Sequence, residues 1–245
     1  MQPVIPLWMT LPIVATNIAI PVVAWLAFQR VARRSARALI APSFVAVALW
    51  LVLAFTLSAR GFFAGSGNSS FPPIAWALIP LVAGYLGYLT LGSARAVVDQ
   101  IPLHRMIGLQ FYRALGVVFL VEWMLGALPG AFALPAGIGD VAIGLTAPFV
   151  AARVRDGAPR ARETAIRWNV LGIADLVVAV TMGVLTTPGS LHLPALGAPN
   201  AGIITLPLVL IPTIAVPFSI LLHLIGLHRL VDRAQPVALG VRRAA

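Results

Sequence analysis

Long runs of apolar residues alternate with short polar segments along the whole chain. Seven runs are long enough to cross a bilayer, which takes about 20 residues in a helix. They cover roughly residues 4–27, 38–58, 72–94, 106–128, 131–152, 164–187 and 203–227. Only helices and closed barrels satisfy the backbone inside lipid. We therefore predict an all-α fold, with residues 1–245 forming a single transmembrane domain that is a bundle of seven transmembrane helices.

The basic residues are distributed unevenly between the segments that connect these runs. All 17 are arginines, and an outside N-terminus leaves 15 of them on the cytoplasmic side. The opposite orientation violates the positive-inside rule, so we predict that the N-terminus lies outside and the C-terminus in the cytoplasm. Arg60 then lies outside, and Arg113 lies within the fourth run. The cytoplasmic set is Arg30, Arg33, Arg34, Arg37, Arg95, Arg105, Arg153, Arg155, Arg160, Arg162, Arg167, Arg229, Arg233, Arg242 and Arg243.

The composition narrows the possible chemistry. Of the 245 residues, 60% are hydrophobic and only 10% are charged, whereas about a quarter are charged in soluble domains. The chain has no cysteine and no lysine, which excludes disulfides, thiolate nucleophiles, Cys-ligated metal sites and Schiff-base chemistry. Because the net charge of +10 lies mainly in the loops, we expect contact with anionic membrane lipids and no nucleic acid. The sequence predicts no oligomeric state.

The four histidines do not form a metal-binding pattern. His223 and His228 are five positions apart, which places them on different faces of a helix. We therefore expect no metal site and no cofactor. His223 is expected either to bond a neighbouring helix or to take part in proton transfer.

Three of the seven acidic residues lie inside predicted helices: Glu122, Asp140 and Asp175. An ionised carboxylate at the centre of a bilayer costs at least about 2.5–3.5 kcal/mol. Intramembrane acids are therefore candidates for a proton relay or for acid/base catalysis. The alternative is structural, in which each acid bonds a neighbouring polar side chain and fixes the register of the helices.

Asp140 and Asp175 are predicted to lie near the middle of the membrane on neighbouring helices. Each follows a glycine by three positions, Gly137 and Gly172, and Gly144 adds another small residue beside Asp140. Small residues allow helices to approach closely, so the two aspartates are expected to share a polar centre. Two adjacent carboxylates resist ionising together, which suits a proton relay or a general acid.

Four further polar residues are candidates to bind a substrate or to pair with the acids: Arg113, His223, Asn169 and Asn17. Arg113 either extends toward the inner headgroups or neutralises a buried aspartate or an anionic substrate. It is nine positions from Glu122, which puts the two on opposite faces of an ideal helix. We therefore expect no pair between them.

Proline shapes the first and last predicted helices. Pro12 and Pro21 flank Asn17, and Pro207, Pro212 and Pro217 recur every five residues. Each proline frees a backbone carbonyl, so these helices either bend around a cavity, as in transporters, or carry static kinks.

Two short segments of similar sequence fall where outer loops are expected. "PGAFALPA" (129–136) and "PGSLHLPA" (188–195) match at five of eight positions. They are expected to form either lids or turns. A duplication of helix pairs and a chance match both remain open.

Segments of the last four helices resemble a family of bacterial multi-pass membrane proteins that is uncharacterised. The segments are "FYRALG", "LPGAFALPAGIGD", "RWNVLGIADLVVA" and "LPLVLIPTIAVPFSILLHL", and the resemblance covers roughly residues 106–228. It implies a multi-pass protein of the bacterial cytoplasmic (inner) membrane and implies no activity.

Three functions are compatible with these features. The first is a small-solute or proton-linked transporter that uses the intramembrane carboxylates. The second is an intramembrane enzyme that acts on a lipid or isoprenoid substrate by acid/base chemistry. The third is a structural or assembly subunit. The expected ligand is accordingly a small molecule or lipid-like, and the sequence leaves open whether the protein is an enzyme.

Overall fold

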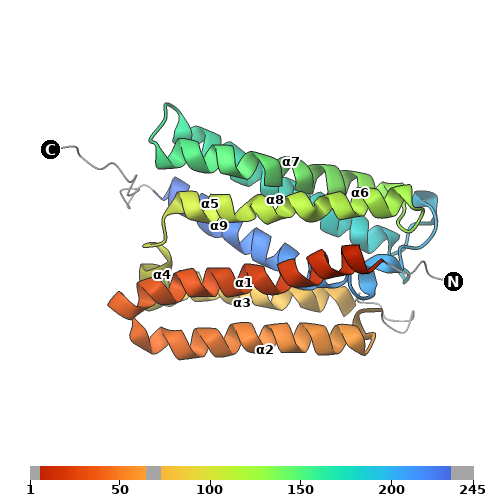
Figure 1. Ribbon diagram of the computed structural model, residues 1–245, viewed down its shortest axis with the longest axis horizontal. Helices are drawn as coiled ribbons and strands as arrows, with labels where there is room; N and C mark the ends of the chain where they lie inside the picture. The colour runs from red at the N-terminus through yellow and green to blue at the C-terminus, as the bar shows by residue number, and fades with distance from the viewer. Residues whose placement is uncertain (1–5, 65–72, 233–245) are drawn as a thin grey trace.

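The apolar runs form helices that lie lengthwise beside one another in the computed structural model, which describes residues 6–64 and 73–232 (Figure 1). Within those residues, seven helical segments are long and apolar enough to cross a membrane. They are Leu7–Arg34, Arg37–Ala59, Pro73–Thr90, Leu103–Met124, Gly130–Arg155, Ala161–Thr186 and Ile211–Val231. The all-helical prediction and the seven predicted runs are confirmed. Arg233, Arg242, Arg243 and the first residues of the first run lie outside the described residues.

The elements follow one another with few irregular connections. The first three crossings contain α1 (Leu7–Ser35), η1 (Arg37–Leu39), α2 (Ile40–Ala59), η3 (Pro73–Leu78) and α3 (Ile79–Thr90), with η2 (Phe62–Ala64) after α2. The short helix α4 (Gly92–Val98) then leads to α5 (Leu103–Leu109), η4 (Gln110–Gly116), α6 (Val117–Met124), α7 (Gly130–Arg155) and α8 (Ala161–Thr186). The last described elements are η5 (Pro194–Leu196), η6 (Gly202–Ile204), η7 (Ile211–Ala215) and α9 (Val216–Val231).

The fourth crossing is not the continuous α-helix that the sequence predicts. Its middle, η4, is a 3₁₀ helix of seven residues, longer than the three or four residues that are usual for this geometry. Side chains three positions apart eclipse one another in a 3₁₀ helix. The buried residues of η4 follow this period, since they are Gln110, Arg113 and Gly116.

The seventh crossing begins later than predicted. Residues near 203 form only the short η6, and regular helix starts at η7, a π-helix, before continuing as α9. Pro212 lies in the first turn of η7, where a missing N–H leaves no carbonyl unpaired. Pro217 lies where η7 passes directly into α9, and the carbonyl oxygen of Thr213, four residues before it, accepts from Trp50 Nε1 at 3.0 Å. Pro12 and Pro21 lie inside α1.

The two similar segments have different structures. Residues 130–136 belong to the first turns of α7, so most of "PGAFALPA" is helical and not the outer loop that was expected. Residues 188–195 are irregular apart from the start of η5. The likeness in sequence is therefore not a likeness in local structure.

Helix α7 lies at the centre of the packing that forms the site. It contacts α5, η4 and α6 on one side and α8 on another. α9 packs against α8, α5 and α3, and α2 lies at the edge against α1 (Figure 1). α5, η4, α6 and α8 therefore flank α7, α9 packs behind α8 and α5, and α1 adds a wall through its contacts with η4 and η7.

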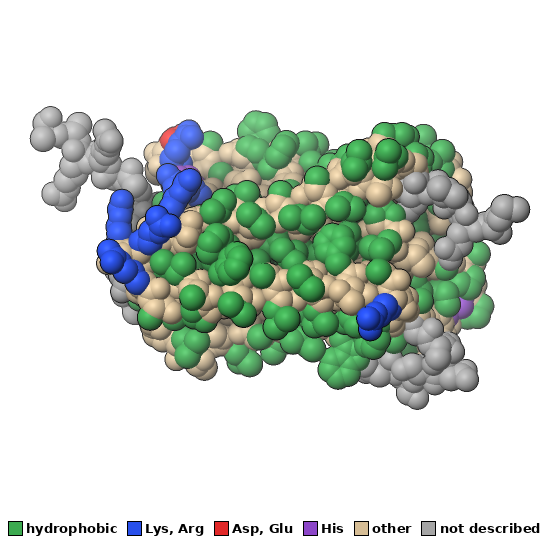
Figure 2. Space-filling model, turned by 60° about the horizontal axis from the view of Figure 1, so that its bottom comes forward, with side chains coloured by type: hydrophobic (Ala, Val, Ile, Leu, Met, Phe, Trp, Pro, Cys, Tyr) green, Lys and Arg blue, Asp and Glu red, His purple; other side chains and the backbone are tan. Residues whose placement is uncertain are grey.

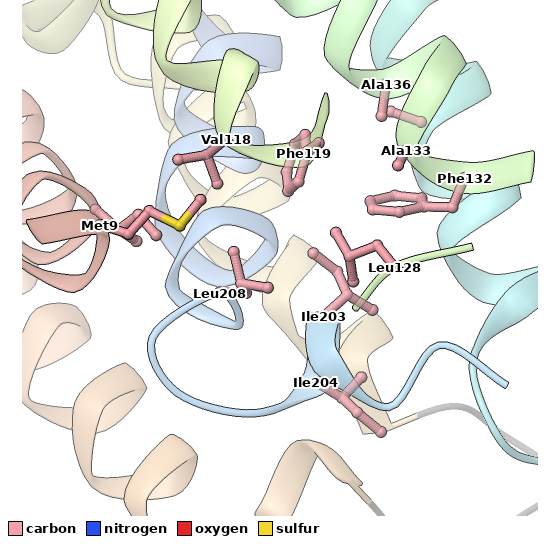
Figure 3. Close-up of a cluster of buried hydrophobic side chains, with 12 residues drawn as sticks. Met9, Val118, Phe119, Leu128, Phe132, Ala133, Ala136, Ile203, Ile204 and Leu208 are labelled. Carbon is pink, nitrogen blue, oxygen red and sulfur yellow. The ribbon is translucent and has the colours of Figure 1, made fainter. Parts of the chain in front are cut away.

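The two largest of the four apolar clusters lie toward opposite ends of the bundle. The cluster at the end that carries the start of α1 includes Phe119 and Phe132, whose ring centroids are 5.2 Å apart (Figure 3). On α7 this cluster ends at Ala136, and the second cluster begins at Ile143. The residues between the two clusters on α7 and α8 include Asp140, Asn169 and Asp175. The apolar packing thus places a polar layer in the middle of the bundle.

The surface separates charge from apolar area. Figure 2 shows arginine side chains gathered at one end of the displayed face and apolar side chains along the length between the ends. Because Arg37 lies in η1 directly before α2 and Arg60 directly after α2, these two arginines lie at opposite ends of the bundle. Large apolar side chains such as Leu49 and Phe149 are 63% and 72% exposed. An apolar band of this kind fits a lipid environment better than water.

Candidate functional site

The guanidinium of Arg113 joins three helices. Its Nε donates to Asp140 Oδ1 on α7 at 2.7 Å, and its Nη2 donates to Asp175 Oδ2 on α8. Its Nη1 lies 3.0 Å from His223 Nε2 on α9 and 3.5 Å from the carbonyl oxygen of Gly172. The Arg113 side chain is only 2% exposed. Arg113 is therefore a buried counter-ion of both aspartates and does not extend to the headgroups.

The hydrogen-bond partners of His223 fix its protonation state. Arginine only donates hydrogen bonds, so Nε2 of His223 must accept from Arg113 Nη1. Nδ1 of His223 lies 3.0 Å from Asn169 Oδ1, and Asn169 Nδ2 donates to the carbonyl oxygen of Ala165 at 2.8 Å. Asn169 Oδ1 is thus an acceptor, which requires a proton on His223 Nδ1. The imidazole is therefore neutral, with its tautomer set from both sides.

Glycines allow these polar side chains to lie against neighbouring backbones. A Cβ atom added to Gly116 would come 2.3 Å from Asp140 Cβ, and one added to Gly139 would come 1.6 Å from Asp175 Oδ1. A Cβ on Gly172 would come 2.4 Å from His223 Nε2. Contacts this short do not occur between real atoms. Three members of the centre therefore depend on a glycine in an adjacent helix.

Three glycines lie against other neighbours than the sequence predicts. Gly137, Gly144 and Gly172 were expected to let the fifth and sixth helices approach each other. Instead, a Cβ on Gly144 would meet the Ala114 nitrogen at 2.2 Å, and one on Gly137 would meet Leu120 at 2.6 Å. These positions allow α7 to approach η4 and α6, and Gly172 makes room for His223. The helices that pack against these glycines differ from the predicted ones because a glycine in the sequence indicates a close approach but not which element approaches.

The charges of the centre do not balance. Arg113 contributes one positive charge, Asp140 and Asp175 contribute two negative charges when ionised, and His223 contributes none. The described residues include no other cation within ion-pairing distance of either carboxylate. An excess negative charge in an apolar interior is costly. Uptake of one proton or one small cation would therefore neutralise this excess charge and stabilise the centre.

A cavity of about 40 Å³ borders this centre. Roughly 10–15 Å³ of such volume holds one water, so the cavity has room for a few waters or a small ion. Arg113 and Asp140 form part of its wall, and Asn17 of α1 forms another part. Asp175 does not line it. The remaining polar lining comes from Thr16, Tyr112 and Ser219, and the apolar lining from Ile13, Leu115, Phe119, Leu176, Ile211, Ala215 and Val216.

The structure brings five of the seven predicted site residues into one hydrogen-bonded network: Arg113, Asp140, Asn169, Asp175 and His223. Asn17 is separate and only borders the cavity. Its Nδ2 donates to the carbonyl oxygen of Ile13 at 2.8 Å, and its Oδ1 has no partner among the described residues. Glu122 is also separate from the network, because its Oε1 has no partner among the described residues. The residue is nevertheless buried, with 2% exposed.

Several residues of the site were not predicted from the sequence. The Tyr112 hydroxyl lies 3.2 Å from the carbonyl oxygen of Ala215 and also bonds Ser219 Oγ. Gln110 Nε2 donates to the carbonyl oxygen of Ser219 at 3.1 Å. These contacts join η4 to the start of α9. The nearest signal in the sequence was the position of Gln110 three residues before Arg113.

Acidic and imidazole groups do not gather into a metal site in the described parts of the chain, where no three His, Cys, Asp or Glu side chains are placed to hold a metal ion. The chemistry of the site therefore rests on the two carboxylates, the guanidinium and the neutral imidazole.

Comparison with known proteins identifies a family. No curated protein and no solved structure matches the chain significantly. The sequence model of one family, described as a domain of unknown function (DUF8737), matches residues 73–231. That range holds the whole network around Arg113 but not Asn17. Since the match covers well over half of the 245 residues, the chain belongs to the DUF8737 family.

Proposed function

We propose that the protein is a proton-linked transporter of a small solute in a bacterial cytoplasmic membrane. Its N-terminus lies outside, as the arginine distribution indicates. The network of Arg113, Asp140 and Asp175 is its proton-binding centre. The seven membrane-length helices support a multi-pass arrangement, in which this centre lies between the two apolar clusters and away from both ends.

The observation that carries the proposal is the charge imbalance of the centre. A purely structural pair balances one guanidinium with one carboxylate. Here Arg113 contacts two carboxylates, both with side chains no more than 12% exposed. Binding and release of one proton change the charge of such a centre between neutral and negative. A proton-linked carrier needs a buried group with this property.

The place of the cavity supports the same function. It lies between α1 and the segment from η7 to the start of α9. Both elements carry prolines, and η7 is a π-helix. Interrupted helices line the substrate sites of many transporters because their backbone groups are available there. Asp140 links the proton centre to this cavity, since it belongs to both.

An enzyme of lipids or isoprenoids fits the geometry less well. The cavity is lined largely by apolar residues and reaches a carboxylate, as such an enzyme requires. However, its volume of about 40 Å³ is small beside the several hundred Å³ of a ligand pocket. The cavity thus suits water or a small ion better than an isoprenoid.

A structural role is the second candidate, and one observation favours it. Arg113 ties η4 to α7, α8 and α9 by hydrogen bonds that leave few of its donors unused. In that case the centre only holds the bundle together and the protein transports no solute. Removal of one carboxylate then changes stability but not transport.

The test is solute-driven proton movement in liposomes. The full chain is reconstituted into phosphatidylethanolamine and phosphatidylglycerol vesicles that contain a pH-sensitive dye. A panel of amino acids, sugars, carboxylates, amines and monovalent cations is added outside. We expect proton movement with at least one solute, lost in Asp140→Asn and Asp175→Asn. Rates no greater than in protein-free vesicles for the whole panel contradict the proposal.

Asp156→Asn is the matched control. Asp156 accepts hydrogen bonds from Arg155, which holds the pKa of this carboxyl below its ordinary value. It is therefore ionised near neutral pH, and its side chain is 58% exposed. Replacing it removes one charge at the surface, and we expect proton movement to remain.

A further inference from the structure

Two polar residues that line the cavity beside Arg113, Asp140 and Asn17, each have a side-chain oxygen without a partner among the described residues. Asp140 Oδ1 accepts from Arg113, but Asp140 Oδ2 accepts no hydrogen bond from the described chain. Asn17 is 2% exposed, and its Nδ2 bonds Ile13, which identifies the unpartnered atom as the carbonyl Oδ1. Thr16 adds a hydroxyl oxygen to the same wall. A buried acceptor without a donor is costly, so a bound group that donates hydrogen bonds or carries positive charge would stabilise this wall.

The donors that border the cavity are largely engaged elsewhere. Arg113 directs its donors to Asp140, Asp175, His223 and Gly172. The hydroxyls of Tyr112 and Ser219 bond each other, and the Tyr112 hydroxyl also lies within bonding distance of the carbonyl oxygen of Ala215. The free capacity of the wall is therefore mainly that of an acceptor. A ligand must approach it with N–H or O–H donors or as a cation.

The size and the charge of the site narrow the ligand further. A volume of about 40 Å³ admits an ion with at most a few waters. The excess charge of the centre is a single negative charge, which one monovalent cation neutralises. Carboxylate, amide and hydroxyl oxygens are suitable ligands for hard cations and for ammonium.

We propose that this cavity binds a small monovalent cation between Asp140 and Asn17, in competition with the proton. The proposal rests on the proposed function and deepens it, because it names the substrate class of the carrier. One negative charge is available to both ligands. The protein then holds either a proton on its carboxylates or the cation in its cavity, which makes it a cation/proton exchanger.

The groups around Asp140 determine how the exchange depends on pH. Arg113 on η4 contacts Asp140 directly. The same network includes Asp175 and Asn169 on α8 and His223 on α9. Tyr112 lies on the cavity wall, and α1 contributes Asn17 without charge. Asp140 and Asp175 are the members that bind the exchangeable proton, since arginine stays charged and His223 is held neutral.

The experiment measures protons released from the protein at equilibrium. The full chain in detergent, at low buffer capacity, receives NaCl, KCl, ammonium chloride or methylammonium chloride, each brought to the same pH. Choline chloride is the matched control because its cation is too large for the cavity. We expect at least one small cation to release up to one proton per chain and choline to release none. The cation concentration for half-maximal release should rise about tenfold for each unit of lower pH.

Two variants locate the site. Asn17→Leu keeps the branching of the side chain at Cγ, with somewhat more volume, but replaces Oδ1 by a methyl group, and it should weaken cation binding roughly tenfold, which corresponds to about 1.4 kcal/mol. Asp140→Asn should abolish the release, and Asp156→Asn should leave it unchanged. Release by choline equal to that by the small cations, no release by any of the four cations, or an unchanged response in Asn17→Leu each overturns the proposal. The wild-type comparison with choline does not depend on the folding of any variant.

The two proposals fail in different ways. Proton release by a small cation without any flux in vesicles retains the site and rejects the carrier. Flux driven by another solute, without cation-driven release, retains the carrier and rejects the cation site.

Discussion

Asp175 Oδ1 lies so close to the backbone of Gly139 that a Cβ atom at position 139 would come within 1.6 Å of it. The Asp175 carboxylate, which accepts from Arg113, therefore packs directly against a glycine of the neighbouring helix. Since Asp175 is on α8 and Gly139 is on α7, the geometry of the centre depends on how closely these two helices pack.

Gly139→Ala should displace the Asp175 side chain from Arg113. Overpacking of this kind costs about 1–3 kcal/mol, and we expect a lower thermal unfolding temperature together with loss of proton movement in vesicles. Gly87→Ala is the control, because Gly87 also lies in a membrane-length helix and a Cβ there meets only Leu91 at 4.0 Å. Equal stability and activity of the two variants would show that Asp175 has room to move.

The charge imbalance predicts an unusual order of stabilities. Asp175→Asn leaves one carboxylate beside one guanidinium, so it should unfold at or above the wild-type temperature although proton movement is lost. Arg113→Gln leaves two buried carboxylates without a cation and should cost about 3–5 kcal/mol. Thermal unfolding in detergent at neutral pH checks both. A strongly destabilised Asp175→Asn protein would indicate that the centre serves packing alone.

His223 should be replaceable only by a side chain that both accepts and donates. His223→Ala leaves Arg113 Nη1 and Asn169 Oδ1 without their imidazole partner, and a buried unsatisfied group costs about 1–3 kcal/mol. His223→Gln supplies an amide oxygen and an amide nitrogen and should recover part of this loss. Denaturation of the two variants side by side makes the comparison. If alanine is as well tolerated as glutamine, the imidazole does not connect the network.

Two arginines at the arginine-rich end should contribute differently to stability. Arg229 donates to the carbonyl oxygens of Ile101 at 2.8 Å and Asp99 at 2.7 Å, with a side chain only 17% exposed. Arg95 pairs with Asp232 at 2.7 Å, but both side chains are about one-third exposed, at 31% and 30%. Arg229→Ala should therefore cost about 1.5–3 kcal/mol, and Arg95→Ala no more than about 1 kcal/mol. Thermal unfolding checks this, and the reverse order would contradict the assignment.

The crossings could be predicted from the sequence because length and hydropathy suffice to define them. Apolar runs of about 20 residues have few alternatives in lipid, and the described helices coincide with the seven runs to within a few residues in most cases. The exceptions have local causes. α1 continues to Ser35 through polar residues, where a hydropathy criterion would end the helix earlier. Pro207 lies in the irregular stretch before the last helix.

The candidate site was predictable in its members but not in its connections. Polar residues are rare in these runs, which is why Arg113, Asp140 and His223 stood out. Their mutual contacts depend on the rotation of each helix about its axis. The 3₁₀ geometry of η4 changes that rotation, and no proline or glycine pattern in the sequence predicts it. Asn17 could not be separated from the network on sequence alone, since an isolated polar residue looks the same as a bonded one, whereas the spacing of Glu122 from Arg113 predicted that these two do not pair.

The 3₁₀ segment gives the fourth crossing a mechanical property. Seven residues rise about 14 Å in 3₁₀ form and about 10.5 Å in α form, and the accumulated rotation differs by about 140°. Conversion of Gln110–Gly116 to α-helix would therefore shorten this crossing and turn α5 against α6 in the same step. Arg113 is the middle residue of this segment. Any change of helical pitch would therefore alter both its position along the helix axis and the direction of its side chain.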